Sequence, residues 1–336
     1  VGAATFWRLV EEHGTARAAL NALPEIAEAA GVEDYAPCPE AVAHAELQAG
    51  MAAGARLLCR GESAYPQALA ELSDAPPVLW ALGDLTVATR PMVALVGARN
   101  ASSLGLRMAR KLAEGLGEAG ITVVSGLARG IDAAAHNAAL PTGTVAVMAG
   151  GVDVIYPAEN GDLAREVAKK GLRLSEQPIG LEPLARHFPL RNRIISGIAA
   201  AVVVVEAVAR SGSLITARTA LDQGREVLAV PGHPFDGRAS GCNLLLRDGA
   251  SLVRGVEDVL EALAQKPAPA RATPATTAVT SAPSRRAASG TPVPKSRPRA
   301  ETRALHQDIL DRLGASPLAD YQLIRDLAVS PATVAP

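Results

Sequence analysis

The chain has 336 residues and a formal net charge of −1, a length that predicts roughly two or three domains and a sizeable core. Aromatic residues make up only 3% of it, which excludes a broad aromatic surface for stacking on bases. The three cysteines are widely spaced, and no apolar run reaches about 18 residues. We therefore expect a cytoplasmic protein with no membrane span, no structural metal and no cofactor.

Residues 1–60 have the periodicity of short helices. Apolar side chains recur at helical spacing from Phe6 to Leu23, Pro24 can open a further helix, and Gly31 can end it. Such a bundle is usually a packing or docking module. The less favoured alternative is a helix-hairpin-helix that contacts DNA phosphates.

Strands and helices alternate in residues 61–265. Short β-branched apolar runs, typical of buried parallel strands, occupy 92–96, 121–124, 145–148, 201–205 and 227–230. Amphipathic stretches that predict helices follow at 104–118, 131–140, 162–170, 214–223 and 256–263. The alternation predicts an α/β domain, an extended Rossmann-like parallel sheet with helices on both faces.

Residues 266–300 have the composition of a linker. They contain seven prolines, seven Lys or Arg and no acid, and cannot bury enough apolar area to offset their ordering entropy. Removing these seven charges leaves 26 basic and 34 acidic residues, a net charge of −8. In residues 301–336, two helices are predicted at 303–313 and 318–327, either a plain hairpin or the front of a winged-helix domain.

Four Gly- or Ser-rich turns follow predicted strands, at 97–102, 125–132, 150–153 and 211–216. Ligands of open α/β sheets bind at the carboxyl ends of the strands, and exposed N–H groups at helix starts attract anions. We therefore predict one rim for a phosphate-bearing ligand. Its anion-binding residues would be Gly97, Ser125, Gly126, Gly130, Gly150, Gly151, Ser211, Gly212 and Ser213. No Walker A loop is present, and Arg99 stands where a dinucleotide-binding turn needs its second glycine.

A cationic segment runs from Arg186 to Arg193 around Phe188, before a helix predicted at 194–200. Guanidinium groups bind phosphates and an aromatic ring stacks on a base, which are the contacts of a single-strand binder. Cations oppose the dipole at a helix N-terminus, so three arginines there favour a binding role. The alternative is a solvated helix end with Phe188 in the core.

Four carboxylates, Asp132, Asp153, Glu176 and Glu206, fall at strand or helix ends, and His136 follows Asp132 by one helical turn. A hydrolase would use one of them as a base, but neither a nucleophile elbow nor metal-ligand spacing is present. We therefore predict no catalytic residue. Asp132, His136, Asp153 and Glu206 are expected to brace loops, and Asp132 and His136 can pair on one helix face.

Several motifs resemble, in order, those of the DprA/Smf family, bacterial DNA-processing proteins of natural transformation. The matching stretches are SGLARGIDAAAH (125–136), GGVDVIYPAEN (150–160), LSEQPIG (174–180), FPLRNRIISG (188–197), SGSLITA (211–217) and AVPG (229–232). A lead-in at Tyr65–Gly83, with a strand before the glycine, also fits. The resemblance covers the chain from about Phe6 to Leu263.

This resemblance implies a non-enzymatic protein that binds and protects single-stranded DNA, dimerises through its Rossmann-like domain and loads the RecA recombinase. The residues that would line or brace its DNA pocket are Arg99, Arg186, Phe188, Arg191, Asn192 and Arg193. Arg186 is only the nearest cation to the place of a family lysine. The N-terminal helices are similar to the family's SAM-like module, and residues 301–336 to a truncated winged-helix domain.

Two other functions are kept as alternatives. A nucleotide-processing enzyme, similar to lysine-decarboxylase-like phosphoribohydrolases, would hold nucleoside phosphates with its Gly-rich turns and use Glu206 as an acid or base. A structural adaptor would act through its terminal helices. We favour the DNA-binding recombination mediator because the anion-accepting turns and the arginines around Phe188 occur together.

Overall fold

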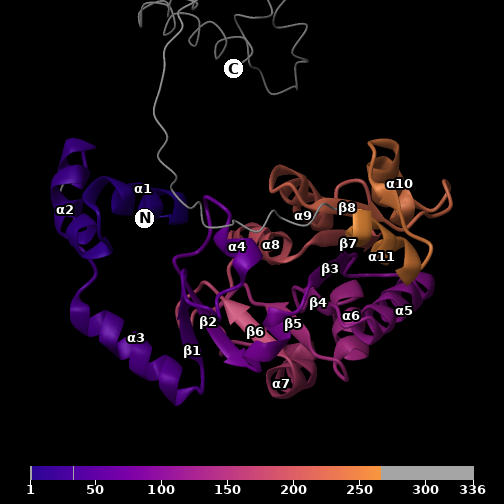
Figure 1. Cartoon of the computed structure of the whole chain (residues 1–336), viewed down its shortest axis with the longest axis horizontal. Coiled ribbons are helices and arrows are strands. Elements are labelled where there is room, and N and C mark those ends of the chain that lie inside the picture. The colour runs from indigo at the N-terminus through magenta and orange to yellow at the C-terminus, as the bar shows by residue number, and fades with distance from the viewer. Residues whose placement is uncertain (1, 33, 266–336) are drawn as a thin grey trace, which may run out of the picture. The chain divides into compact units, whose positions relative to one another are not determined.

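A computed structural model of the chain describes residues 2–32 and 34–265 (Figure 1). The predicted linker at 266–300, the helices predicted at 303–313 and 318–327, and the winged-helix resemblance lie outside the described residues. None of the helices in the described part is long and apolar enough to cross a membrane.

One nine-stranded sheet forms the centre of the described residues, in the order β1-β2-β6-β5-β4-β3-β7-β8-β9. The strands are β1 Arg56–Cys59, β2 Val78–Gly83, β3 Met92–Gly97, β4 Thr122–Ser125, β5 Thr144–Val147, β6 Leu172–Ser175, β7 Ala201–Glu206, β8 Glu226–Ala229 and β9 Ser251–Leu252. β3 to β9 are parallel. All five apolar runs that we predicted as strands are confirmed.

The sheet departs from a purely parallel one at a single edge. β2 pairs antiparallel with β6, and β1 pairs antiparallel with β2. β1 falls inside the segment that we predicted as helical, and β6 was not predicted because Arg173 and Ser175 interrupt its short apolar pattern.

Eleven helices are present among the described residues, and those within 61–265 cover both faces of the sheet. The helices are α1 Ala3–His13, α2 Ala16–Ala29, α3 Glu40–Ala52, α4 Gln67–Ala70, α5 Ser103–Glu118, α6 Ile131–Ala139, α7 Gly161–Lys170, α8 His187–Ile198, α9 Gly212–Asp222, α10 Ser240–Arg247 and α11 Val256–Gln265, with 3-10 turns η1 Leu85–Thr89, η2 Ala158–Asn160 and η3 Gly237–Ala239. Successive side chains of β3 point to opposite faces of the sheet. Val93 and Leu95 pack with α5, α6 and α11, whereas Ala94 and Val96 pack with α4, α8 and α9. The predicted Rossmann-like fold with helices on both faces is confirmed.

The strand order reverses between β3 and β7. From β3 the chain builds outward through β4, β5 and β6, and β7, β8 and β9 then extend the opposite side. Such a switch point opens a crevice at the carboxyl ends of its two central strands, where open α/β sheets bind ligands.

Two indole N–H groups join the N-terminal helices to the sheet. Trp7 Nε1 of α1 donates to the carbonyl oxygen of Ala75 at 2.7 Å, and Trp80 Nε1 of β2 donates to Glu46 Oε1 of α3 at 3.0 Å. Gly50 of α3 allows this close approach, since a Cβ there would lie 2.2 Å from the Trp80 ring. The helical N-terminal module is therefore confirmed.

Candidate nucleic-acid interface

A cavity of about 800 Å³ opens at the switch point between β3 and β7. Its walls come from the turn after β3, the turn after β4, the first half of α8 and the start of α9. The lining residues that matter below are Gly97, Arg99, Ala128, Asp132, Phe188, Arg191, Asn192, Ser211, Gly212, Ser213 and Arg238. Segments that are over one hundred residues apart in sequence thus meet at one place.

Three of the four predicted turns contribute to this cavity, and the fourth does not. Gly150 and Gly151 pack under the loop after β6, where an added Cβ would lie 2.5 Å from the Leu181 carbonyl oxygen and 2.6 Å from Asp153 Oδ1 respectively. The structure therefore does not bring 150–153 to the same rim as the other turns.

Two residues of the predicted turn at 125–132, the last residue of β4 and a glycine after it, also have structural contacts. Ser125 is fully buried, and its hydroxyl donates to the Leu95 carbonyl oxygen at 2.6 Å. Gly130 has φ +77°, and a Cβ there would lie 2.2 Å from the Ala98 carbonyl oxygen. These two residues fix how the turns after β3 and β4 pack together.

Aromatic rings and guanidinium groups gather around Phe188. Arg99 Cζ lies 5.5 Å and Arg191 Cζ 6.0 Å from the centroid of its ring. The Tyr156 ring, 49% exposed, lies 5.7 Å away and is tilted by 55°. A narrow slot is lined by both rings and by Arg99 and Arg129. Sequence reasoning missed Tyr156, although it stands inside the quoted stretch GGVDVIYPAEN.

Arg191 is an internal cross-link of this site. Its side chain is buried, and Nη1 donates to the carbonyl oxygens of Gly126 at 2.6 Å and Val147 at 2.5 Å. Burial lowers the pKa of Arg191 to about 10, and the nearby Asp132 carboxylate opposes that shift. Burial likewise raises the pKa of Asp132, with Arg191 opposing. Arg191 therefore directs Nη1 and Nε to groups of the protein itself, although its side chain also lines the cavity beside Phe188.

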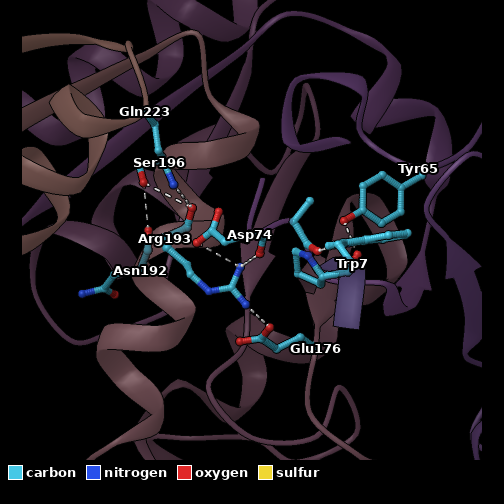
Figure 2. A network of polar contacts seen from close by, with 10 residues as sticks. Trp7, Tyr65, Asp74, Glu176, Asn192, Arg193, Ser196 and Gln223 are labelled. Carbon is cyan, nitrogen blue, oxygen red and sulfur yellow. Dashed lines mark hydrogen bonds and ion pairs between the residues drawn. The ribbon is translucent and has the colours of Figure 1, made fainter. Parts of the chain in front are cut away.

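Arg193 is held in the same way on the other side of α8. Figure 2 shows its guanidinium paired with the Glu176 carboxylate, while Nη1 donates to the Asp74 carbonyl oxygen at 2.8 Å. Burial raises the pKa of Glu176, and Arg193 opposes the shift. Asn192, between the two arginines, accepts a hydrogen bond from Arg191 Nε at 3.2 Å and lines the cavity.

The helix-dipole argument from the sequence is wrong for this segment. α8 begins at His187 and not near Ile194, so Arg191 and Arg193 lie beyond its first turn, where the dipole has little effect. Their place is explained by the buried carboxylates Asp132 and Glu176. Arg186, by contrast, is exposed at the start of α8.

The other predicted bracing residues make the following contacts. Glu206 accepts hydrogen bonds from the backbone N–H and hydroxyl of Ser102, and Asp153 Oδ1 accepts from the Gly180 N–H at 2.9 Å. Asp132 accepts from the N–H groups of Gly126 and Ala128.

His136 does not pair with Asp132. Its Nδ1 lies 2.8 Å from the Thr144 hydroxyl, and burial lowers its pKa to about 3, so the ring is neutral near pH 7. The predicted pairing on one helix face is thus replaced by a contact to the start of β5.

Exposed arginines near the cavity lack acidic partners. Among the described residues, no ion pair within 4 Å is formed by Arg99, Arg186, Arg210, Arg218 or Arg238. Elsewhere exposed cations are often paired, as in Arg8 with Glu12 and Arg254 with Asp258. The carboxyl edge of the sheet therefore carries positive charge that no acidic residue in the described part of the chain pairs with.

A family model described as DNA recombination-mediator protein A matches residues 56–264. The chain belongs to this family. A second model, described as the DprA-like N-terminal HHH domain, matches residues 1–49. This family model therefore assigns a helix-hairpin-helix architecture to the N-terminal helices, which was the less favoured alternative from the sequence.

Curated relatives agree with this assignment. The DNA processing protein DprA of Streptococcus pneumoniae is 46% identical over 201 residues, covering 59% of this chain and 71% of that protein. The DprA protein of Bacillus subtilis is 43% identical over 60% of this chain and 69% of its own length. Protein Smf of Escherichia coli is 45% identical over 59% of this chain and 54% of its own.

Solved structures give the same result. The X-ray structure of DprA from Streptococcus pneumoniae has a TM-score of 0.62 and 42% identity, covering 67% of this chain and 78% of that one. DNA processing protein A from Helicobacter pylori, whose structure concerns its single-stranded DNA binding mode, has a TM-score of 0.58 and 30% identity. It covers 63% of this chain and 96% of that one.

Proposed function

We propose that this chain is a recombination mediator that binds single-stranded DNA in the switch-point cavity. The observation that carries the proposal is the grouping of Phe188, Tyr156 and Arg99 at a crevice edged by unpaired arginines. Aromatic faces bind unstacked bases and guanidinium groups bind the phosphates between them. A paired duplex does not offer such bases, so the arrangement favours a single strand.

The residues divide into two groups by exposure. Arg99, Arg186 and Arg238 are exposed and would contact phosphates. Phe188 and Tyr156 would stack on bases, with Asn192 at the cavity wall as a hydrogen-bonding group. Arg191 and Arg193 would act mainly as positioning residues, because most of their donors already bind groups of the protein.

Membership of the family supports the remaining parts of the proposal. We propose that the protein acts in the cytoplasm without catalysis, protects incoming DNA in natural transformation, dimerises through its Rossmann-like domain and passes the strand to RecA recombinase. The domain boundaries at 60, 265 and 300 stay predictions. No observation favours a nucleotide-processing enzyme, since the buried Glu206 carboxylate already accepts two hydrogen bonds from Ser102.

Fluorescence anisotropy with oligothymidylate over a salt series tests the proposal. The affinity should fall as salt rises, with a log–log slope of about 0.7 for each phosphate contact. Arg99→Glu should weaken binding at least about tenfold without unfolding the protein, because an exposed charge is reversed at the phosphates. Arg165→Glu on α7 is the matched control. A salt-independent affinity that survives Arg99→Glu would show that the proposal is wrong.

A further inference from the structure

A second cavity, of about 660 Å³, lies beside the first on the carboxyl edge of the sheet. We call it the α5 groove: one wall is α5, from Ser102 to Glu114, and the other is the segment 230–239 after β8. The two cavities are neighbours along the chain at two places. Gly97–Asn100 lines the first and Ser102–Gly105 the second, while Arg238 lines the first and Asp236 and Ala239 line the second.

The α5 wall carries a stripe of unneutralised cations. Arg107, Arg110 and Lys111 are exposed on α5, within one helical turn of one another. Within the described residues, none of the three forms an ion pair within 4 Å. The stripe therefore presents positive charge to the groove.

Three carboxylates also line the α5 groove, and two of them are engaged elsewhere. Glu206 is buried and accepts hydrogen bonds from Ser102, and Asp236 Oδ1 accepts from the Arg238 N–H at 2.9 Å. Glu114 is exposed at the far end of the groove. The cations thus face the groove without a carboxylate in contact.

An exposed aromatic side chain, Phe235, lies in the segment 230–239 whose other residues form the opposite wall. Phe235 is 96% exposed, and its ring lies 5.5 Å from the His233 ring, which lines the groove, with a tilt of 37°. An exposed ring beside a groove lined by cations offers a face on which an unpaired base can stack. Cations along one wall and an aromatic face on the other are the two features by which proteins hold single strands.

We propose that the α5 groove binds the continuation of the strand held in the switch-point cavity. Phosphates would lie along Arg107 and Lys111, and one base would stack on Phe235. The inference rests on the proposed function and extends it. The bound stretch of single-stranded DNA would then be longer than the switch-point cavity alone can hold. Nucleic acid is the occupant we favour because the cation stripe complements a phosphodiester backbone.

The test compares a short and a long oligothymidylate, about 6 and about 25 nucleotides, on the full chain. For Arg107→Gln with Lys111→Gln, the affinity for the short strand should stay unchanged. The affinity for the long strand should fall at least about fivefold, with its salt slope reduced by about 1.4 for two lost phosphate contacts. Arg165→Gln with Lys169→Gln, a pair with the same spacing on α7, should change neither affinity.

Phe235→Ala is a second, independent test of the groove. Because the Phe235 side chain is exposed, its removal should leave the fold intact. The affinity for the long strand should fall about fivefold with no change in salt slope. Equal losses for both strands, or no loss for the long one, would overturn the inference. So would a change of oligomeric state with unchanged affinity, since the groove would then be a protein interface. If the wild-type chain fails to bind even the short strand, the proposed function itself fails.

Discussion

Arg191 and Arg193 lie two residues apart in α8, and both guanidinium groups form hydrogen bonds within the protein. One binds the carbonyl oxygens that end β4 and β5, and the other binds Glu176 and Asp74. Together they fix the helix that carries Phe188. The cations left over for a ligand are the exposed ones, Arg99 among them.

Replacing Arg191 by alanine should therefore act on stability before it acts on binding. The buried carbonyl oxygens of Gly126 and Val147 would lose their donor, and Asp132 would lose a nearby positive charge, so the free energy of unfolding should fall by about 3 kcal/mol. Urea denaturation measures this change. Arg99→Ala, at an exposed position, should stay within about 0.5 kcal/mol of wild type; similar losses for both variants would contradict the distinction.

Tyr156 and Phe188 should contribute to binding through stacking. Replacing either by alanine should weaken single-strand affinity by about 1–3 kcal/mol and leave the salt slope unchanged, because a base contact is lost and no phosphate contact. Tyr156→Phe keeps the ring and should bind as wild type. Anisotropy over a salt series gives both quantities, and a slope change in Tyr156→Ala would argue against stacking.

His136 should make stability depend on pH. Its pKa is lowered by burial from 6.5 to about 3, so between these values the unfolded chain binds more protons than the folded one. Stability is fully present above pH 6.5 and falls as the pH decreases, by at most about 1.4 kcal/mol per pH unit from this group.

The measurement is the free energy of unfolding from pH 7.5 to 5. His136→Gln should flatten the slope in this range. The raised pKa of Asp132 acts in the opposite direction at lower pH, since the folded state then binds the extra proton. An unchanged slope in the variant would show that another group is responsible.

Among the elements, the short segment 74–77 joins three parts of the fold. Its successive carbonyl oxygens accept from Arg193 of α8, Trp7 of α1, the Tyr65 hydroxyl and the Arg60 N–H. Figure 2 shows three of these side chains around it. The N-terminal helices and the helix beneath the candidate site thus share one support.

Replacing Trp7 by phenylalanine tests this support from the α1 side. The ring stays beneath the Arg60 guanidinium, now 4.4 Å away, but the hydrogen bond to Ala75 is lost. We expect a loss of about 1 kcal/mol and faster limited proteolysis in α1 and α2. Equal cleavage rates in wild type and variant would contradict the role of this hydrogen bond.

At the scale of the whole molecule, the net charge of −1 conceals a strong asymmetry. Residues 266–300 supply seven positive charges, and the rest of the chain has a net charge of −8. Despite that excess of acid, the exposed arginines at the carboxyl edge of the sheet stay unpaired among the described residues. Local and not average charge therefore governs attraction of a polyanion.

Deleting residues 266–300 separates the two sources of charge. The affinity for a short oligothymidylate at moderate salt should change less than about threefold, because every residue of the candidate site lies before 266. The same anisotropy measurement with Arg99→Glu in the deleted chain serves as the positive control. A tenfold loss on deletion alone would assign capture of the strand to the basic segment.

The sequence by itself determined the α/β class, the five central strands and the family, and it predicted Arg99 and Phe188 as residues of the DNA site. Short apolar runs and glycine-rich turns are local features, so they can be recognised from consecutive residues alone. Only the tertiary structure decided which arginines are free. Arg191 and Arg99 look alike in sequence, but two backbone carbonyl oxygens accept hydrogen bonds from Arg191, and among the described residues Arg99 has no such partner. The burial of an arginine and its hydrogen-bond partners depend on segments distant in sequence. The same is true of the contact between the Tyr156 and Phe188 rings.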